Sequence, residues 1–125
     1  MSLAPRHTNL TGADPHTATA AAVQGVLQFS GRLSLHHGGS LDQPSLGWRL
    51  AGKPGAPIVV ALGGISAHRR VFDPDQPRAG WWCEIAGPGR ALDSTRVRVL
   101  GVDYLGGSGE STGPTAGGVF PSLSS

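Results

Sequence analysis

Two runs of mostly apolar residues constrain the fold of this chain more than any other feature. The first covers residues 57–62 and stops at Gly63 and Gly64, and the second covers residues 97–103. Such runs are typical of strands that are buried on both faces, as in parallel sheets. About 34 residues separate the runs, which is enough for a crossover connection between parallel strands. We therefore predict an α/β architecture in which residues 57–62 and 96–102 are neighbouring parallel strands.

A different pattern precedes these runs. Leu46, Trp48 and Leu50 alternate with smaller or polar residues, as expected of a strand with one buried face. A short, turn-rich connection separates them from another strand-like segment, residues 26–35. We therefore expect residues 26–35 and 45–51 to form an antiparallel pair beside the parallel strands.

The length of 125 residues allows one domain. Residues 1–25 are mostly small or turn-forming, so we predict a disordered or weakly ordered tail that buries too little apolar surface to offset its ordering entropy. Residues 26–125 would be the ordered part, with a short helix at residues 81–85. No further elements follow residues 97–103 to cover a parallel strand, so the sequence resembles the first part of a larger α/β domain.

Composition excludes several classes of function. The formal net charge is +2 and the basic residues are scattered, so no basic patch for nucleic acid is visible. No apolar run approaches the length of a membrane span, and the N-terminus lacks a signal-peptide pattern. Cys83 is the single cysteine, and His36 and His37 are too few for a metal site. We expect a cytoplasmic protein that binds neither metal, nucleic acid nor membrane.

The turn after the first apolar run is the leading candidate site. Ligands of open α/β sheets gather at the carboxyl ends of strands, and the two glycines would let backbone approach a ligand closely. Gly63, Gly64, Ile65 and Ser66 form this turn. A plain strand-ending turn without function is the alternative.

Charged residues follow the same turn. Arg69 and Arg70 are suited to hold a carboxylate or a phosphate, although a solvated loop would have the same composition. His68 is a candidate general base, but no nucleophile is visibly placed for it.

Residues 109–113 match the G-x-S-x-G pattern of a nucleophile elbow, with Ser111 as its serine. An elbow needs a strand directly before the serine and a helix directly after it, and neither is expected here. No histidine follows His68 and no acidic residue follows Glu110, so a Ser-Asp-His order cannot be completed. We therefore predict that Ser111 is not catalytic.

Several blocks of this sequence occur in an order that is specific to one family. They are residues 38–39, the strand containing Trp48, residues 56–68, the Gly-Trp-Trp of residues 80–82, residues 85–94, residues 102–107, residues 109–114 and the Phe-Pro of residues 120–121. Over about residues 26–125 the chain resembles the homoserine O-acyltransferases, an α/β-hydrolase family of methionine biosynthesis. The resemblance implies the N-terminal part of an α/β-hydrolase domain.

The resemblance also implies a reaction. A serine would take an acyl group from acyl-CoA and pass it to the homoserine hydroxyl, with no cofactor besides this co-substrate. Backbone N–H groups at Gly64 and Ile65 would contribute to the oxyanion hole, and Gly63, Ser66, Arg69 and Arg70 would contact substrate. The parent enzyme is expected to be a homodimer.

The chain departs from the family pattern in ways that bear on function. Many members have His-Ala-Leu-Thr-Gly where this chain has residues 62–66, a turn that is linked to acyl choice, and Glu110 interrupts the Gly-Ser-Thr-Gly-Pro motif. We favour succinyl over acetyl, because the glycines leave room and the arginines offer positive charge. The catalytic triad would lie beyond Ser125, so this chain alone is expected to be inactive and poorly soluble. A fragment of an α/β-hydrolase esterase and a non-catalytic remnant remain alternatives.

Overall fold

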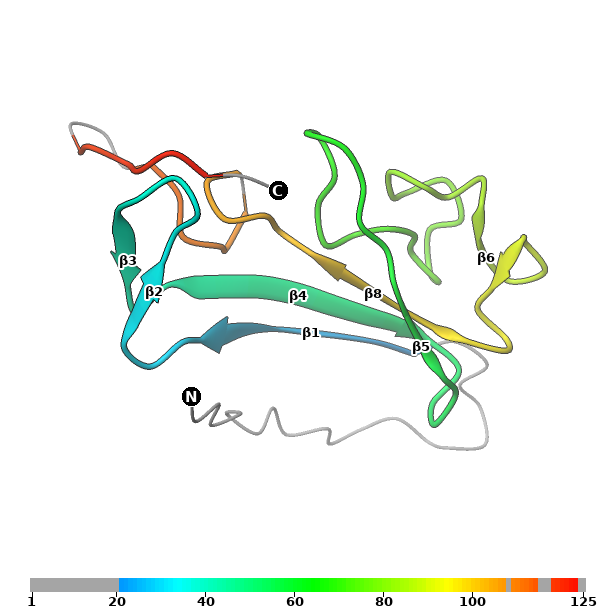
Figure 1. The fold of residues 1–125 in the computed structure, drawn as a ribbon. Helices are drawn as coiled ribbons and strands as arrows, with labels where there is room; N and C mark the ends of the chain where they lie inside the picture. The colour runs from blue at the N-terminus through cyan, green and yellow to red at the C-terminus, as the bar shows by residue number, and fades with distance from the viewer. Residues whose placement is uncertain (1–20, 108, 115–117, 124–125) are drawn as a thin grey trace.

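The computed structural model describes residues 21–107, 109–114 and 118–123. Its main element is a four-stranded sheet with the strand order β1-β4-β8-β5 (Figure 1). The strands are β1 (Ala21–Gln28), β4 (Ser45–Gly52), β8 (Arg98–Val102) and β5 (Ile58–Val60). β4 pairs antiparallel with both β1 and β8, while β5 pairs parallel with β8. The predicted parallel pair and the predicted antiparallel pair are therefore both confirmed.

The described strands include two short pairs outside the main sheet. β2 (Arg32–Ser34) pairs antiparallel with β3 (Ser40–Asp42), and β6 (Ala86–Gly87) pairs parallel with β7 (Leu92–Asp93). The prediction of one strand over residues 26–35 is wrong, because Gly31 takes a φ of 89° and separates β1 from β2.

The predicted boundary of the tail also needs correction. β1 begins at Ala21, so residues 21–25 belong to the sheet. Apart from Val23 these residues are small or polar and carry little strand signal of their own, but their backbone pairs with β4 from Ala21 opposite Gly52 to Gly25 opposite Trp48. Residues 1–20 of the predicted tail lie outside the described residues.

The predicted helix at residues 81–85 is a single turn instead. The amides of Ile85 and Ala86 both donate to the carbonyl of Trp82, at 2.9 Å each, and the chain then enters β6. Gly80, with a φ of 106°, and Gly87, with a φ of 149°, bracket the turn in conformations that a helix cannot contain. No α-helix is present in the described ranges, so none of their segments is a helix that spans a membrane.

Packing covers one face of the main sheet. The core comprises Ala51, Ala61 and Val99 from the sheet with Val71, Phe72 and Ala86 from the crossover between β5 and β8. The opposite side of β5 is open, since Ile58 and Val60 are exposed. The prediction that residues 57–62 are buried on both faces is therefore wrong for this chain, because β5 is an edge strand and no described helix covers it.

Asp93 closes the turn between the last crossover strand and β8. Its carboxylate accepts bonds from the Gly89 amide at 3.1 Å, the Thr95 amide at 3.0 Å and the Thr95 hydroxyl at 2.8 Å. The bond from the Thr95 amide, followed by those from the Thr95 hydroxyl and the Gly89 amide, lowers the pKa of Asp93 below its ordinary value of 3.8.

This pKa shift predicts how stability depends on pH. A carboxylate with a lowered folded-state pKa stabilises the fold above its ordinary pKa, and the effect is lost as the pH falls through the lowered value. We expect Asp93→Asn to be less stable than the parent at neutral pH, with the difference narrowing in acid. Urea denaturation of both chains at a series of pH values measures this. A difference that is constant with pH would contradict it.

Candidate functional site

The candidate site is the segment that leaves β5, residues 63–69, which we call the β5 turn. Its base is fixed to the sheet, because the Ala61 amide donates to the Leu100 carbonyl of β8 at 2.9 Å. Its tip is a tight turn in which the Ala67 amide donates to the Gly64 carbonyl at 2.9 Å, and the Ile65 side chain is fully exposed. The turn therefore projects beyond the carboxyl end of β5, where ligands of α/β sheets bind.

Two backbone donors at the tip have no hydrogen-bond partner among the residues that the structure describes. Within the described ranges, the amide N–H groups of Gly64 and Ile65 make no hydrogen bond to a backbone or side-chain acceptor. Adjacent N–H groups on a fixed turn are the arrangement that stabilises an oxyanion. The turn is therefore able to donate to a negatively charged oxygen.

The two glycines of the turn differ in their surroundings. A Cβ atom on Gly63 would lie 2.6 Å from the Ala67 side chain and 2.7 Å from the Trp81 ring, whereas one on Gly64 would meet nothing within 4 Å. Trp81 and Ala67 therefore fill the space beside Gly63, and only Gly64 faces open space. Ser66 is exposed at the tip.

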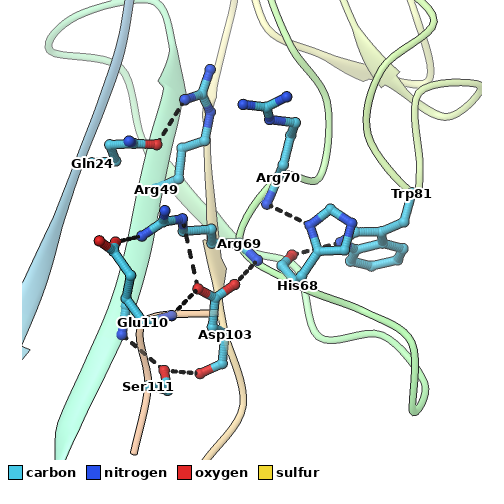
Figure 2. Close-up of polar contacts among 10 residues, drawn as sticks. Gln24, Arg49, His68, Arg69, Arg70, Trp81, Asp103, Glu110 and Ser111 are labelled. Carbon is cyan, nitrogen blue, oxygen red and sulfur yellow. Dashed lines mark hydrogen bonds and ion pairs between the residues drawn. The ribbon is translucent and has the colours of Figure 1, made fainter. Parts of the chain in front are cut away.

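Three side chains hold the backbone of the β5 turn in place through hydrogen bonds. The Tyr104 hydroxyl donates to the Gly63 carbonyl at 2.9 Å, and the Trp81 indole N–H donates to the His68 carbonyl at 2.7 Å. Asp103 accepts the Arg69 amide at 2.8 Å (Figure 2). Tyr104 and Asp103 directly follow β8, so the turn after one parallel strand is fixed by residues after its neighbour.

The ring of His68 lies over the backbone of the same turn. Its Nδ1 atom accepts the Arg70 amide at 3.2 Å (Figure 2). In the part of the chain that the structure describes, no serine or cysteine donates to this ring, so no nucleophile–base pair is assembled here.

The two arginines of the candidate site have different partners. The guanidinium of Arg69 lies between the Asp103 carboxylate, at 3.6 Å, and Glu110, with which it also forms an ion pair. Arg70 instead extends toward Arg49 (Figure 2). Both guanidinium groups form an ion pair with Asp73, at 3.6 Å for Arg70 and 3.4 Å for Arg49. Arg70 shares the Asp73 carboxylate with Arg49, and its side chain is 46% exposed. Arg70 is therefore more available than Arg69 to pair with the carboxylate or phosphate of a ligand.

Ser111 is built into the sheet at the end of β4. Its hydroxyl accepts the Gly47 amide at 2.9 Å and donates to the Asp103 carbonyl, while the Asp103 amide donates to the Gly47 carbonyl at 2.9 Å. In an antiparallel pair Gly47 and Asp103 would exchange two backbone hydrogen bonds. Here the Ser111 hydroxyl replaces one of them, because it bridges the Gly47 amide and the Asp103 carbonyl. Ser111 is buried, and its hydroxyl both donates and accepts within the fold, which is the environment of a structural group.

Other candidates from the sequence stay apart from the β5 turn. Cys83 is partly buried and its thiol donates to the Arg78 carbonyl at 3.6 Å. His36 and His37 contact each other edge to face, with ring centroids 5.0 Å apart. No group of three or more potential metal ligands occurs among residues 21–107, 109–114 and 118–123.

The supporting residues of the turn were missed by sequence reasoning. Asp103 and Tyr104 were read only as part of a strand end and a family block, because their contacts join positions that lie 34 and 41 residues apart. A polar pair directly after an apolar strand was the available signal, since it places side chains at the carboxyl edge of the sheet.

Comparison with characterised proteins gives curated relatives but no matching family model. The chain is 38% identical over 124 residues to a homoserine O-succinyltransferase of Xanthomonas campestris, covering 91% of this chain and 32% of the relative. It is 36% identical over 94 residues to the homoserine O-succinyltransferase of Laribacter hongkongensis, covering 70% of this chain and 25% of that relative. A homoserine O-acetyltransferase of Symbiobacterium thermophilum is 45% identical over 56 residues, covering 45% and 15%. The chain thus spans a third or less of these relatives.

Solved structures share the fold. A homoserine O-acetyltransferase from Staphylococcus aureus superposes with a TM-score of 0.66 at 24% identity, over 81% of this chain and 30% of that protein. Esterase E22 superposes with a TM-score of 0.61 at 20% identity, also over 81% and 30%. The chain therefore has the N-terminal portion of an α/β-hydrolase fold, and in sequence it is a homologue of the homoserine O-acyltransferases over about a third of their length.

Proposed function

We propose that this chain is the part of a homoserine O-acyltransferase that supplies one side of the oxyanion hole. The observation that carries the proposal is the pair of unpartnered N–H groups at Gly64 and Ile65, on a turn fixed at the carboxyl end of β5. The homology to homoserine O-succinyltransferases and O-acetyltransferases supports the reaction class.

The proposed chemistry proceeds in two acyl transfers. A serine oxygen attacks the thioester carbonyl of acyl-CoA, and the tetrahedral oxyanion collapses to a serine ester as the CoA thiolate leaves. The homoserine hydroxyl then attacks this ester, and the serine is released as O-acylhomoserine forms. The nucleophile and the other triad residues lie beyond Ser125 in this proposal. The Gly64 and Ile65 amides stabilise both oxyanions, where loss of one donor typically costs 10²–10³-fold in kcat.

For the acyl donor we propose succinyl-CoA. A terminal carboxylate needs space and a cation; Gly64 faces open space, and Arg70 shares its carboxylate partner with Arg49. Relatives that match 91% and 70% of this chain are named O-succinyltransferases. Acyl-CoA is then a co-substrate and no cofactor is required. We further propose a cytoplasmic homodimer.

Arg70 gives a test of donor choice in the complete acyltransferase. Arg70→Ala should lower kcat/KM for succinyl-CoA about tenfold and leave acetyl-CoA nearly unaffected, because a charge-assisted contact at a half-exposed site contributes about 1.5 kcal/mol. Arg69→Ala is the matched control, since Arg69 is already paired with Asp103 and Glu110 and its loss should affect both donors equally. Equal small losses with both donors for Arg70→Ala would remove the basis for a succinyl preference.

The proposed reaction is tested by following CoA release and O-acylhomoserine formation by the complete protein, with and without homoserine. Release that depends on homoserine and is matched by O-acylhomoserine supports acyl transfer. Release that does not require homoserine would identify a hydrolase of the esterase type. No release by the complete protein would identify a non-catalytic remnant. The 125-residue chain alone should show no turnover.

A further inference from the structure

We propose that Tyr104 is a positioning residue that orients and strengthens the Gly64 N–H donor. The inference rests on the proposed oxyanion role of the β5 turn. Its physical basis is that the Tyr104 hydroxyl donates to the Gly63 carbonyl at 2.9 Å, and this carbonyl belongs to the same peptide group as the Gly64 N–H.

The orientation follows from the planarity of the peptide. In a trans peptide the C=O and N–H bonds point in opposite directions and rotate together. The structure contains no cis peptide in its described residues, so anchoring the Gly63 carbonyl on Tyr104 directs the Gly64 N–H away from Tyr104. Glycine at both positions leaves this peptide plane free to rotate, so an external anchor is needed to fix it.

The strengthening follows from polarisation. A hydrogen bond accepted by the carbonyl draws electron density from the amide nitrogen and makes its N–H a better donor, as in chains of hydrogen bonds. Within the described ranges the Gly64 N–H has no protein acceptor, so this added donor strength is available to a bound oxyanion.

Tyr104 is itself held firmly enough to act as an anchor. It follows Asp103, which is 3% exposed and whose amide donates to the Gly47 carbonyl at 2.9 Å. The Tyr104 carbonyl accepts the Gly107 amide at 3.0 Å. The backbone is therefore hydrogen-bonded both at Asp103, directly before Tyr104, and at Tyr104 itself. Trp81 and Ala67 further limit the space beside Gly63, because a Cβ atom there would lie 2.7 Å and 2.6 Å from them.

The test uses the 125-residue chain labelled with ¹³C and ¹⁵N at glycine. Gly-Gly peptides occur four times in the sequence, at residues 38–39, 63–64, 106–107 and 117–118, so a carbonyl-to-amide NMR experiment isolates them. Tyr104→Phe, which keeps the ring, should move the Gly63 carbonyl signal upfield and slow the base-catalysed exchange of the Gly64 amide, because an N–H that is no longer polarised is less acidic. Thr112→Val is the control, because it removes a hydroxyl that accepts the Ser45 amide and should leave both signals in place.

A second probe avoids any loss of packing. Tyr104 is the single tyrosine of the chain, so growth with 3-fluorotyrosine alters this hydroxyl alone. The more acidic hydroxyl is a stronger donor and should move the Gly63 carbonyl signal downfield, opposite to Tyr104→Phe. Gly63 and Gly64 signals that respond to neither change would overturn the proposal.

The catalytic consequence is measured separately in the complete acyltransferase. Tyr104→Phe should lower kcat up to about tenfold with an unchanged KM for homoserine, the amount expected from one hydrogen bond realised in the transition state. An unchanged kcat in an active enzyme would overturn the positioning role. If the complete protein transfers no acyl group at all, the proposed function fails, whereas the NMR response still decides whether Tyr104 controls the Gly63–Gly64 peptide.

Discussion

Asp103→Ala is expected to lower the free energy of unfolding by about 3 kcal/mol, the low end of the range for breaking a buried ion pair. The carboxylate accepts the amides of Arg69, at 2.8 Å, and Glu110, at 3.3 Å, and it faces the Arg69 guanidinium. Its removal leaves both amides without this acceptor. Arg69 keeps Glu110 as a partner, which is why the low end of the range applies.

The control for this prediction is Asp103→Asn, which has the same shape and keeps an acceptor oxygen for the Arg69 amide. It should lose clearly less stability than Asp103→Ala, with the difference between the two measured by urea denaturation. Equal losses for both variants would mean that the site is held by packing rather than by the acceptor. Gly47 lies close to the Asp103 carboxylate, since a Cβ atom on Gly47 would be 2.8 Å from Oδ2 of Asp103. Side chains larger than aspartate are therefore unsuitable as replacements at position 103.

The second large effect is expected at Gly63. Gly63→Ala should destabilise the chain by about 2 kcal/mol, because the added Cβ would lie 2.6 Å from Ala67 and 2.7 Å from the Trp81 ring. Gly64→Ala is the neighbouring control and should leave stability nearly unchanged, since its Cβ would meet no atom within 4 Å.

Thermal unfolding of these two variants, followed by Trp fluorescence, measures the difference. A larger loss of stability for Gly63→Ala than for Gly64→Ala would show that Gly63 is packed against its neighbours and that Gly64 is not. Similar losses for Gly63→Ala and Gly64→Ala would contradict the placement of Trp81 against the turn.

The sheet could be predicted where the residue pattern is typical of paired strands, although the burial of β5 that the same pattern suggested is not observed. The run at residues 57–62 and the alternation around Trp48 indicated the parallel and antiparallel pairs that the structure contains. The start of β1 could not be predicted, because Ala21 and Ala22 carry no alternation and are extended only through their pairing with β4. The single turn at residues 81–85 has helix-compatible residues, but its length is limited by the flanking glycines.

The candidate site was predictable only in part. The position of Gly64 and Ile65 after an apolar run followed from the general behaviour of α/β sheets. The supports of the turn did not follow, because the contacts of Tyr104 with Gly63 and of Ser111 with Gly47 join residues that are 41 and 64 positions apart. Such contacts depend on strand order, which a single sequence does not specify.

The central claim is that this chain supplies backbone N–H donors, at Gly64 and Ile65, and not the nucleophile for acyl transfer onto homoserine. It is tested most directly by incubating the complete protein with succinyl-CoA without homoserine and locating the acyl ester by peptide mass spectrometry. We expect an ester on a serine outside residues 1–125, which homoserine then discharges, and no ester on Ser111. An acyl ester on Ser111, together with loss of turnover in Ser111→Ala at unchanged stability, would contradict it.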